Sequence, residues 1–518
     1  MSMVSKQVSM ELTSGNDDYD PKSKDFKLSA FEKSIIAMGS LVVVLFMVLA
    51  NHPEFYKKNS SYSDTFSAEN STSTGQKILL IKGWAGINET RNFALANEKK
   101  SIGSYKNDIT GMTLSTIGIG TYEDDTSDKV DDAGTLAIYE SVKHGVNVLD
   151  TSANKKSERT VGKALSLLLS SGIVDRQSLF LSIKAVSFNN DTQNATLETN
   201  RISKPESIIS QSNGLPSVGV TNAKYCITPD CLERSLSSSR WNLGIDTIDV
   251  LYISNAAEIL LEVLEREVFM QMLNTTFTYL ETQRSQNRIR YYGMSTRSCF
   301  TSDESVRTYL SLHDVVALAA SVGGEGHGFR FIQVPISVTF PGAVKTQSQK
   351  NGDTIIAAAA AMGINVVSSR SIGGGKQKSL ERAGSIFRAC TDTTDYFHTL
   401  GESMRLISAK ATKKKSNGQA SHLSTAAQSL LITRSVPGVL TALVGMRTSH
   451  HVHENLAVLS LPVIPSSIVT ECLFTKSSVV DAGLGGSEMT SLKSLDPNSH
   501  KKPRKKRKKH NMRKRDIS

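Results

Sequence analysis

The sequence predicts an α/β protein whose main domain is a (β/α)8 TIM barrel, with an N-terminal transmembrane helix and disordered termini. Two observations predict the barrel. From about residue 109 to 465, eight short apolar runs alternate with amphipathic stretches, the pattern of parallel strands joined by helices. None of these runs leads into the GxGxxG turn of a doubly wound nucleotide-binding sheet, which is the main alternative. Eight strands in roughly 350 residues suit such a barrel.

The predicted strands are short runs rich in Val, Ile and Leu, and four of the amphipathic stretches are predicted helices. The strands are expected at residues 114–120, 146–150, 178–184, 248–254, 289–295, 329–335, 364–369 and 440–445. The helices are expected at residues 133–143, 157–169, 229–243 and 423–433. A Ser- and Asn-rich insertion at 185–222 follows the third strand and is expected at the surface.

The segment before the barrel contains a candidate membrane anchor. Residues 1–33 are polar and of mixed charge, which predicts disorder. The next segment, 34–50, has seventeen residues and no charge, at the short end of the roughly 20 that span a bilayer. A soluble helix seldom lacks a polar face over this length, so an anchor is favoured over a buried core helix. Residues 51–108 are rich in Ser, Thr and Asn and are predicted to form a polar stalk.

Signals for the side of the membrane disagree. Four lysines precede the anchor, at positions 22, 24, 27 and 33, and two follow it, at 57 and 58, which favours a cytosolic N-terminus and a lumenal barrel. Glycosylation sequons agree with this orientation; they begin at Asn59, Asn70, Asn88, Asn190, Asn194 and Asn274. The five cysteines are few and scattered, without metal or redox spacing, and are predicted to be buried or idle thiols. Few cysteines favour the cytosol, so the side stays open.

The positive charge is confined to the C-terminal tail. The chain has a formal net charge of +11, and eleven of the fifteen residues from 501 to 515 are Lys or Arg. The barrel is therefore close to neutral, and the charge does not predict a basic binding face on it. Residues 466–518 are predicted to be a disordered tail. The basic run suits an anionic lipid surface or another polyanion.

Six segments, in order along the chain, resemble the aldo-keto reductase family of NADP-dependent carbonyl reductases. "TIGIGTY" resembles the family's first strand, and "VLDTSA" followed by "KSERTVGKAL" resembles its second strand and the helix after it. "LERSLSSSRWNLGIDTIDVLYIS", "NRIRYYGMST", "FIQVPIS" with "GINVVSSRSI", and "VPGVLTALVGMRTSHHVHENL" are similar to the later segments. The resemblance covers about residues 110–460 and implies a barrel that binds NADP(H).

The resemblance implies a catalytic tetrad of which this sequence has half. Asp150 and Lys184 match the Asp and Lys that lower the pKa of a proton-donating tyrosine. No tyrosine lies between Asp150 and Glu158, and Ser254 occupies the histidine position. Tyr122, at the end of the first strand, is the candidate that could donate the proton instead. The simpler interpretation is that its ring stacks in the wall of the pocket.

The positions for the cofactor agree better with the family. Ser295, Thr296 and Gln333 correspond to the residues that hold the nicotinamide amide. A second group corresponds to the ring-stacking, phosphate-binding and adenosine-binding positions: Ser369, Arg370, Gly445, Arg447 and Asn455. An arginine suits a 2′-phosphate because its planar guanidinium binds in a bidentate manner.

Three functions remain open from the sequence. The first is a membrane-anchored NADP-dependent oxidoreductase that reduces a small-molecule carbonyl, with activity weakened or lost. The second is an NADPH-binding pseudoenzyme or scaffold, because a missing general acid typically lowers a rate by about 10²–10⁴-fold. The third is an adaptor whose basic tail binds polyanions. Turnover, substrate and oligomeric state are not predicted.

Overall fold

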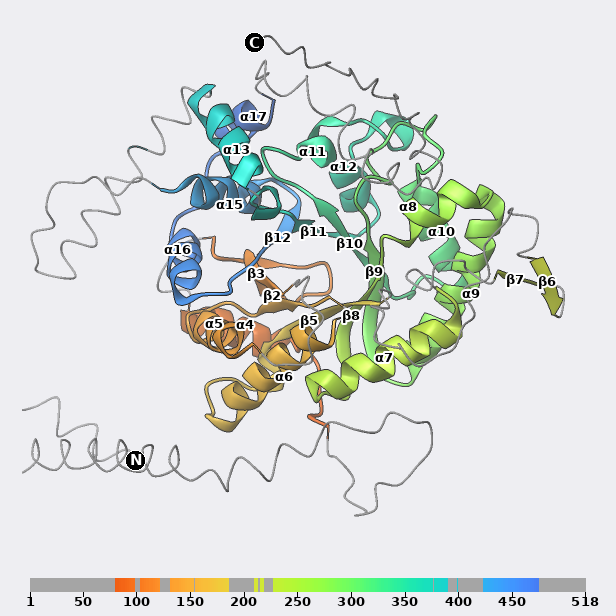
Figure 1. The fold of residues 1–518 in the computed structure, drawn as a ribbon, viewed down its shortest axis with the longest axis horizontal. Coiled ribbons are helices and arrows are strands. Elements are labelled where there is room, and N and C mark those ends of the chain that lie inside the picture. Colours follow the sequence, from red (N-terminus) through yellow and green to blue (C-terminus); the bar gives the residue numbers. More distant parts are fainter. Residues whose placement is uncertain are drawn as a thin grey trace, which may run out of the picture. The chain divides into compact units, whose positions relative to one another are not determined.

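The computed structural model contains a closed barrel of eight parallel strands surrounded by helices (Figure 1). It describes residues 80–97, 103–121, 131–152, 154–185, 209–212, 215–218, 227–375, 377–389, 398 and 423–474. Around the barrel the strands follow one another in chain order, and β12 closes the ring by pairing with β3 in parallel. The predicted (β/α)8 fold is confirmed.

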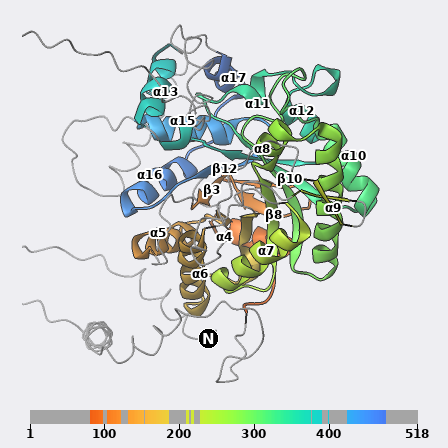
Figure 2. The same ribbon diagram turned by 45° about the vertical axis from the view of Figure 1, so that its right-hand side comes forward.

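The barrel strands are β3 (Ile117–Gly120), β4 (Val148–Asp150), β5 (Phe180–Ala185), β8 (Ile248–Ser254), β9 (Ile289–Ser295), β10 (Phe329–Pro335), β11 (Asn365–Ser369) and β12 (Val439–Val444). The helices after them include α5 (Asp132–Lys143), α6 (Lys155–Ser170), α7 (Pro229–Leu243), α8 (Ala256–Val263), α9 (Arg266–Ser285), α10 (Leu312–Gly323), α11 (Gly342–Lys345), α12 (Ile355–Ala361), α13 (Gln377–Ala389), α15 (Thr425–Ser435), α16 (Ser449–Leu459) and α17 (Ser466–Phe474). Figure 2 shows the same ring of helices from a second direction.

Local chemistry fixes several of the helix ends. The side chain of Asn154 caps α6 by accepting the backbone N–H groups of Lys156 and Ser157. A proline stands in the first turn of α7, and Gly244 ends this helix in the left-handed region with φ of 71°. These signals explain why the observed bounds of α7 equal the predicted ones.

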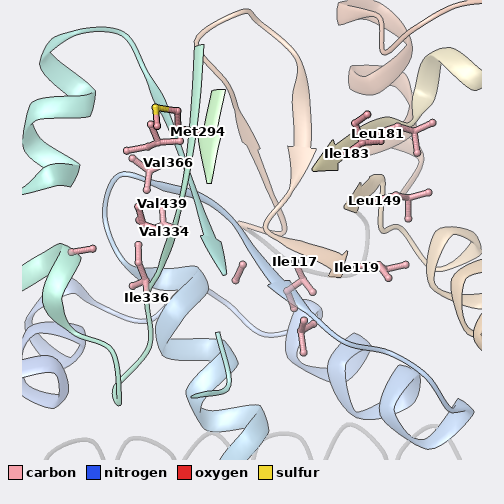
Figure 3. Close-up of a cluster of buried hydrophobic side chains, with 14 of the residues drawn as sticks. Ile117, Ile119, Leu149, Leu181, Ile183, Met294, Val334, Ile336, Val366 and Val439 are labelled. Carbon is pink, nitrogen blue, oxygen red and sulfur yellow. The ribbon is translucent and has the colours of Figure 1, made fainter. Parts of the chain in front are cut away.

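Two apolar layers hold the barrel together. The larger layer lies between the strands and the surrounding helices. Figure 3 labels ten of its side chains, among them Ile119, Leu149 and Val334. The smaller layer fills the interior and includes Val148, Phe180, Tyr252 and Phe331. Side chains of a strand alternate between its two faces, so the residues two positions beyond this interior layer reach the carboxyl-terminal mouth of the barrel.

A segment that was predicted to be part of the polar stalk closes the amino-terminal end of the barrel. From residue 80 onward the chain is packed: α4 (Ile87–Asn97) is followed by an antiparallel pair, β1 (Tyr105–Asn107) and β2 (Thr113–Ser115). The backbone N–H of Ala85 donates to Asp249 over 2.6 Å. Asp249 also accepts from the Leu181 N–H and forms a buried ion pair with Arg176, 2.8 Å each. This polar base ties the early segment to β8 and β5.

Three further differences concern element boundaries. The first predicted strand, 114–120, is divided into β2 at the base and β3 in the barrel, since the chain turns between the two. The predicted tail from residue 466 begins as helix α17, which buries Val469, Cys472 and Leu473. Within the predicted insertion, β6 (Ile209–Ser212) and β7 (Leu215–Val218) form an antiparallel hairpin.

The cysteines differ in part from the expectation of idle thiols. Cys231, in α7, is disulfide-bonded. Cys299 is a free, buried thiol, as predicted, and Cys472 is buried as well. A disulfide is typical of proteins that fold in an oxidising compartment.

No helix within the described part of the chain is long and apolar enough to cross a membrane. The predicted anchor at 34–50 and the basic run at 501–515 lie outside the described residues.

Candidate active site

The candidate site lies at the carboxyl ends of adjacent strands. Asp150 ends β4, and Lys184 is the last residue but one of β5. The two side chains form an ion pair between Lys184 Nζ and Asp150 Oδ2, in which the carboxyl group is 5% and the lysine side chain 21% exposed. The Lys184 ammonium also lies 3.5 Å from the Thr151 carbonyl oxygen. The pair predicted from the sequence is therefore formed, and Lys184 is the more exposed of its two side chains.

Polar neighbours on other strands hold the carboxylate of Asp150 in place. Its Oδ1 accepts from Ser182 Oγ at 2.6 Å and from Gln333 Nε2 at 3.2 Å. The Gln333 Oε1 in turn accepts from Ser295 Oγ at 3.1 Å. One hydrogen-bond network thus runs across the mouth from β9 through β10 to β4 and β5. It joins the predicted catalytic pair to two predicted cofactor residues, Ser295 and Gln333.

The phenol and imidazole positions of the family are changed as the sequence indicated. Only residues 151–154 separate β4 from α6, and none of them is a tyrosine. Ser254, at the histidine position, is the last residue of β8, is buried, and pairs in register with Ser295. Tyr122, the proposed substitute acid, lies outside the described residues.

Several hydroxyls around the mouth are buried but have no hydrogen-bond partner in the described part of the chain. They belong to Thr151 and Ser152, directly after Asp150, and to Thr296, directly after β9. A buried polar atom without a partner costs about 1–3 kcal/mol. Such atoms therefore mark places where a ligand or ordered water completes the hydrogen bonding.

The other predicted cofactor residues lie at the ends of the last two strands and after them. Ser369 ends β11, and Arg370 has φ of 54° and places its guanidinium 5.3 Å from the ring centre of Phe340. Gly445 is exposed just after β12. These residues share no hydrogen bond with the Asp150 network in the described part of the chain.

Arg447 and Asn455 follow in the segment that leads into α16 and in that helix. The Arg447 side chain is 61% exposed, and its guanidinium is 3.9 Å from an Asp131 oxygen. Asn455 is buried within α16. An anion from solvent can therefore reach the Arg447 guanidinium.

Sequence reasoning missed three residues of the site. Ser182 lies two positions before Lys184, so strand alternation alone places it on the same inward face. Tyr252 lies two positions before Ser254 and is inward for the same reason. Glu258 accepts the backbone N–H groups of Arg297 and Ser298, just after Thr296. No local signal identifies Glu258, because its partners lie on another βα unit.

A buried carboxyl group lies behind the site at the first turn of α6. Glu158 accepts from Ser239 Oγ and, at 2.8 Å, from Asn242 Nδ2, both of α7. Burial is the main cause that raises the pKa of Glu158 to about 7, against the two hydrogen bonds and the charge of Arg159, which lower it. Glu158 thus connects the first turn of α6 to α7, and its pKa lies near neutrality.

The carboxylate–ammonium pair lies at the carboxyl-terminal mouth of a parallel barrel. Enzymes with this fold have their active sites at that end of the strands. The sequence profile described as "Aldo/keto reductase family" matches residues 116–472. The chain belongs to the aldo/keto reductase family.

The solved structures that match the chain are distant in sequence. An aldo/keto reductase from Klebsiella pneumoniae in complex with NADP and acetate is 14% identical, with a TM-score of 0.41 over 72% of this chain and 94% of that one. A putative 2,5-diketo-D-gluconic acid reductase B is 13% identical, with a TM-score of 0.44 over 72% and 92%. A thermostable aldo-keto reductase with the inhibitor epalrestat is 16% identical, with a TM-score of 0.42 over 71% and 98%. The comparison with curated proteins found no match.

Proposed function

We propose that this protein is an NADP-dependent oxidoreductase that reduces the carbonyl group of a small molecule at the Asp150–Lys184 pair. The observation that carries the proposal is the ion pair itself, which lies at the mouth with a partly exposed lysine and with unpartnered hydroxyls nearby. Family membership supports the same reaction class. A packing role alone is a weaker account, because apolar side chains often replace a buried ion pair without loss of stability.

The residues at the mouth fit a nicotinamide cofactor. The hydroxyl of Thr296 is buried and unpartnered at the position where the family holds the nicotinamide amide. Ser295 and Gln333 lie beside it, and the amide of Gln333 has a further N–H and lone pair to offer. Arg447 and Arg370 supply positive charge for phosphate groups. When bound there, NADPH supplies the hydride that is added to the carbonyl carbon.

The protein's own contribution is the proton and its placement. We assign the proton donor to Lys184, whose ammonium transfers one proton to the carbonyl oxygen as that oxygen gains charge, which leaves an alcohol and a neutral amine. Solvent then returns a proton to the amine. Asp150 keeps the ammonium oriented. We assign to the Ser254 hydroxyl, at the end of β8, the role of holding the substrate oxygen. Tyr122 is the alternative donor, and Tyr122→Phe distinguishes the two.

The absence of the family's tyrosine and histidine favours a second candidate, an NADPH-binding protein without turnover. We further propose that residues 34–50 anchor the protein in a membrane and that the basic run at 501–515 binds anionic lipid headgroups or another polyanion. These proposals rest on the sequence alone.

Nicotinamide fluorescence during NADPH titration, followed by turnover with a set of aldehydes and ketones, tests the proposal. We expect NADPH binding, slow turnover, and loss of turnover in Lys184→Met. The matched control is Lys163→Met, because Lys163 forms an exposed ion pair with Asp132 over 2.6 Å, away from the mouth. Binding without turnover supports the second candidate. No binding at millimolar NADPH contradicts both candidates.

A further inference from the structure

Tyr252 is a phenol inside the barrel, next to the proposed proton donor. Strands β5 and β8 are parallel and pair Lys184 with Tyr252 in register, so both side chains lie on the inward face. Tyr252 is 1% exposed and belongs to the interior cluster with Phe180 and Phe331. Its ring therefore lies within the apolar layer beneath the mouth.

The hydroxyl of Tyr252 has no hydrogen-bond partner in the described part of the chain. Tyr292, on the neighbouring strand β9, is buried to the same degree, but its hydroxyl donates to Glu281 Oε1 over 2.9 Å. A phenylalanine at position 252 would fill the same space without a buried, unsatisfied hydroxyl. Packing explains the ring of Tyr252 and leaves its hydroxyl unexplained.

The charge that acts on this hydroxyl is that of Asp150. Burial is the main cause that raises the pKa of Tyr252 well above its usual value, and the negative charge of Asp150 is the second. The phenol therefore stays protonated near neutral pH, so its O–H is available to donate a hydrogen bond. Of the two oxygens of Asp150, Oδ1 accepts from Ser182 and Gln333, whereas Oδ2 accepts from Lys184.

We propose that Tyr252 is a positioning residue of the reaction: its hydroxyl donates to Asp150 when the Lys184 ammonium turns from the carboxylate to the substrate oxygen. This inference rests on the proposed function of Lys184. The hydroxyl is unpartnered while Lys184 and Asp150 are paired, and it gains its partner when the pair opens. The buried carboxylate then keeps a donor throughout the proton transfer.

A thermodynamic cycle tests this without requiring turnover. Lys184→Met removes the ammonium permanently, so Tyr252 should bond Asp150 in that background. We expect Tyr252→Phe to raise the urea midpoint of the otherwise unchanged protein and to lower it in the Lys184→Met protein. The control, Tyr292→Phe, should lower the midpoint in both backgrounds, because its bond to Glu281 is always formed. A Tyr252→Phe effect of the same sign in both backgrounds overturns the proposal.

Kinetics give a second measurement, which decides the question if Lys184→Met does not fold. Tyr252→Phe should lower kcat on the order of tenfold while KM and the NADPH Kd stay within about twofold. An unchanged kcat overturns the proposal, and Tyr292→Phe should leave kcat unchanged. Failure of the proposed function would be recognised in the wild-type protein, as absent NADPH binding or absent turnover. The sign of the midpoint shifts decides the role of Tyr252 independently of that result.

Discussion

The buried carboxyl group of Glu158 makes the stability of the barrel depend on pH. Its pKa is about 7 in the folded protein and 4.5 in the unfolded chain. The folded state therefore binds the proton of the Glu158 carboxyl group more tightly than the unfolded chain does. The stabilisation that results from this tighter binding is fully present below about pH 4.5. As pH rises from 4.5 through 7, the unfolded chain has released the proton while the folded protein still binds it. The shift corresponds to about 3 kcal/mol of unfolding free energy lost over this window.

Glu158→Gln should remove this dependence. The amide is neutral at every pH, and it can accept from Asn242 and donate to Ser239 in place of the protonated acid. We expect the variant and the wild type to differ little at pH 5. At pH 8 the variant should be the more stable by up to about 3 kcal/mol. Urea unfolding at both pH values, followed by fluorescence, measures the difference.

Glu233→Gln is a control with the opposite sign. Its hydrogen bond to Arg288 is the main cause that lowers the pKa of Glu233 to about 2, so its stabilisation is present above the unfolded pKa and is lost as pH falls towards 2. Glu233→Gln should therefore be less stable than the wild type near neutral pH. If Glu158→Gln and the wild type have parallel stability profiles from pH 5 to 8, Glu158 is ionised in the folded barrel and the reasoning is refuted.

Three other predictions concern the base, the cofactor and the compartment. Arg176→Met leaves the carboxylate of Asp249 buried without its cation, so the unfolding free energy should fall by about 3–5 kcal/mol in urea titrations; a change below 1 kcal/mol contradicts this. Arg447→Met should weaken NADPH binding on the order of tenfold and leave NADH binding unchanged, and equal effects would show that Arg447 does not meet the 2′-phosphate. If the barrel folds in an oxidising compartment, the exposed Asn88 and Asn274 carry glycans, and glycosidase treatment of the native protein lowers its mass; an unchanged mass would place the barrel elsewhere.

Short-range patterns predicted the barrel well because each strand carries its own signal. The strands at 289–295 and 329–335 have the predicted bounds. The predicted helix at 229–243 is also exact in its bounds, because proline and Gly244 mark its ends. In these elements local preference and tertiary packing agree.

The base of the barrel could not be predicted in the same way. The place of residues 80–97 depends on partners far along the chain, such as Asp249, which lies 164 residues after Ala85. Composition describes the segment but does not identify those partners. The same limit applies to Glu258, whose carboxylate holds the loop after Thr296 from a different βα unit. Contacts between units become visible only in the folded protein.

The site residues that were predicted lie at the carboxyl ends of strands. Others can be placed only by the alternation of side chains along a strand. Asp150 and Lys184 could be paired in advance because parallel strands bring their carboxyl ends together. Ser182 lies on the inward face by the same rule, although the sequence offers no reason to choose it over other serines. Which hydroxyls lack partners depends on atomic positions, and the sequence contains no signal for it.

The carboxylate of Asp249 at the base and three hydroxyls at the mouth of the barrel differ in a way that bears on function. At the base, both oxygens of Asp249 accept hydrogen bonds from the backbone or from Arg176. At the mouth, the hydroxyls of Thr151, Ser152 and Thr296 are buried and unpartnered within the described residues. Apolar side chains at these three positions would avoid a cost of about 1–3 kcal/mol each.

A barrel that served only as a rigid body would gain stability from such replacements at the mouth. The polar mouth is therefore better explained by a bound molecule with several hydrogen-bonding groups, such as a nicotinamide and a carbonyl compound. Replacing Thr296 by Val, which has nearly the same shape, tests this argument: the free protein should become more stable and NADPH binding weaker. If Thr296→Val stabilises the protein and leaves NADPH affinity unchanged, the hydroxyl does not belong to a cofactor site.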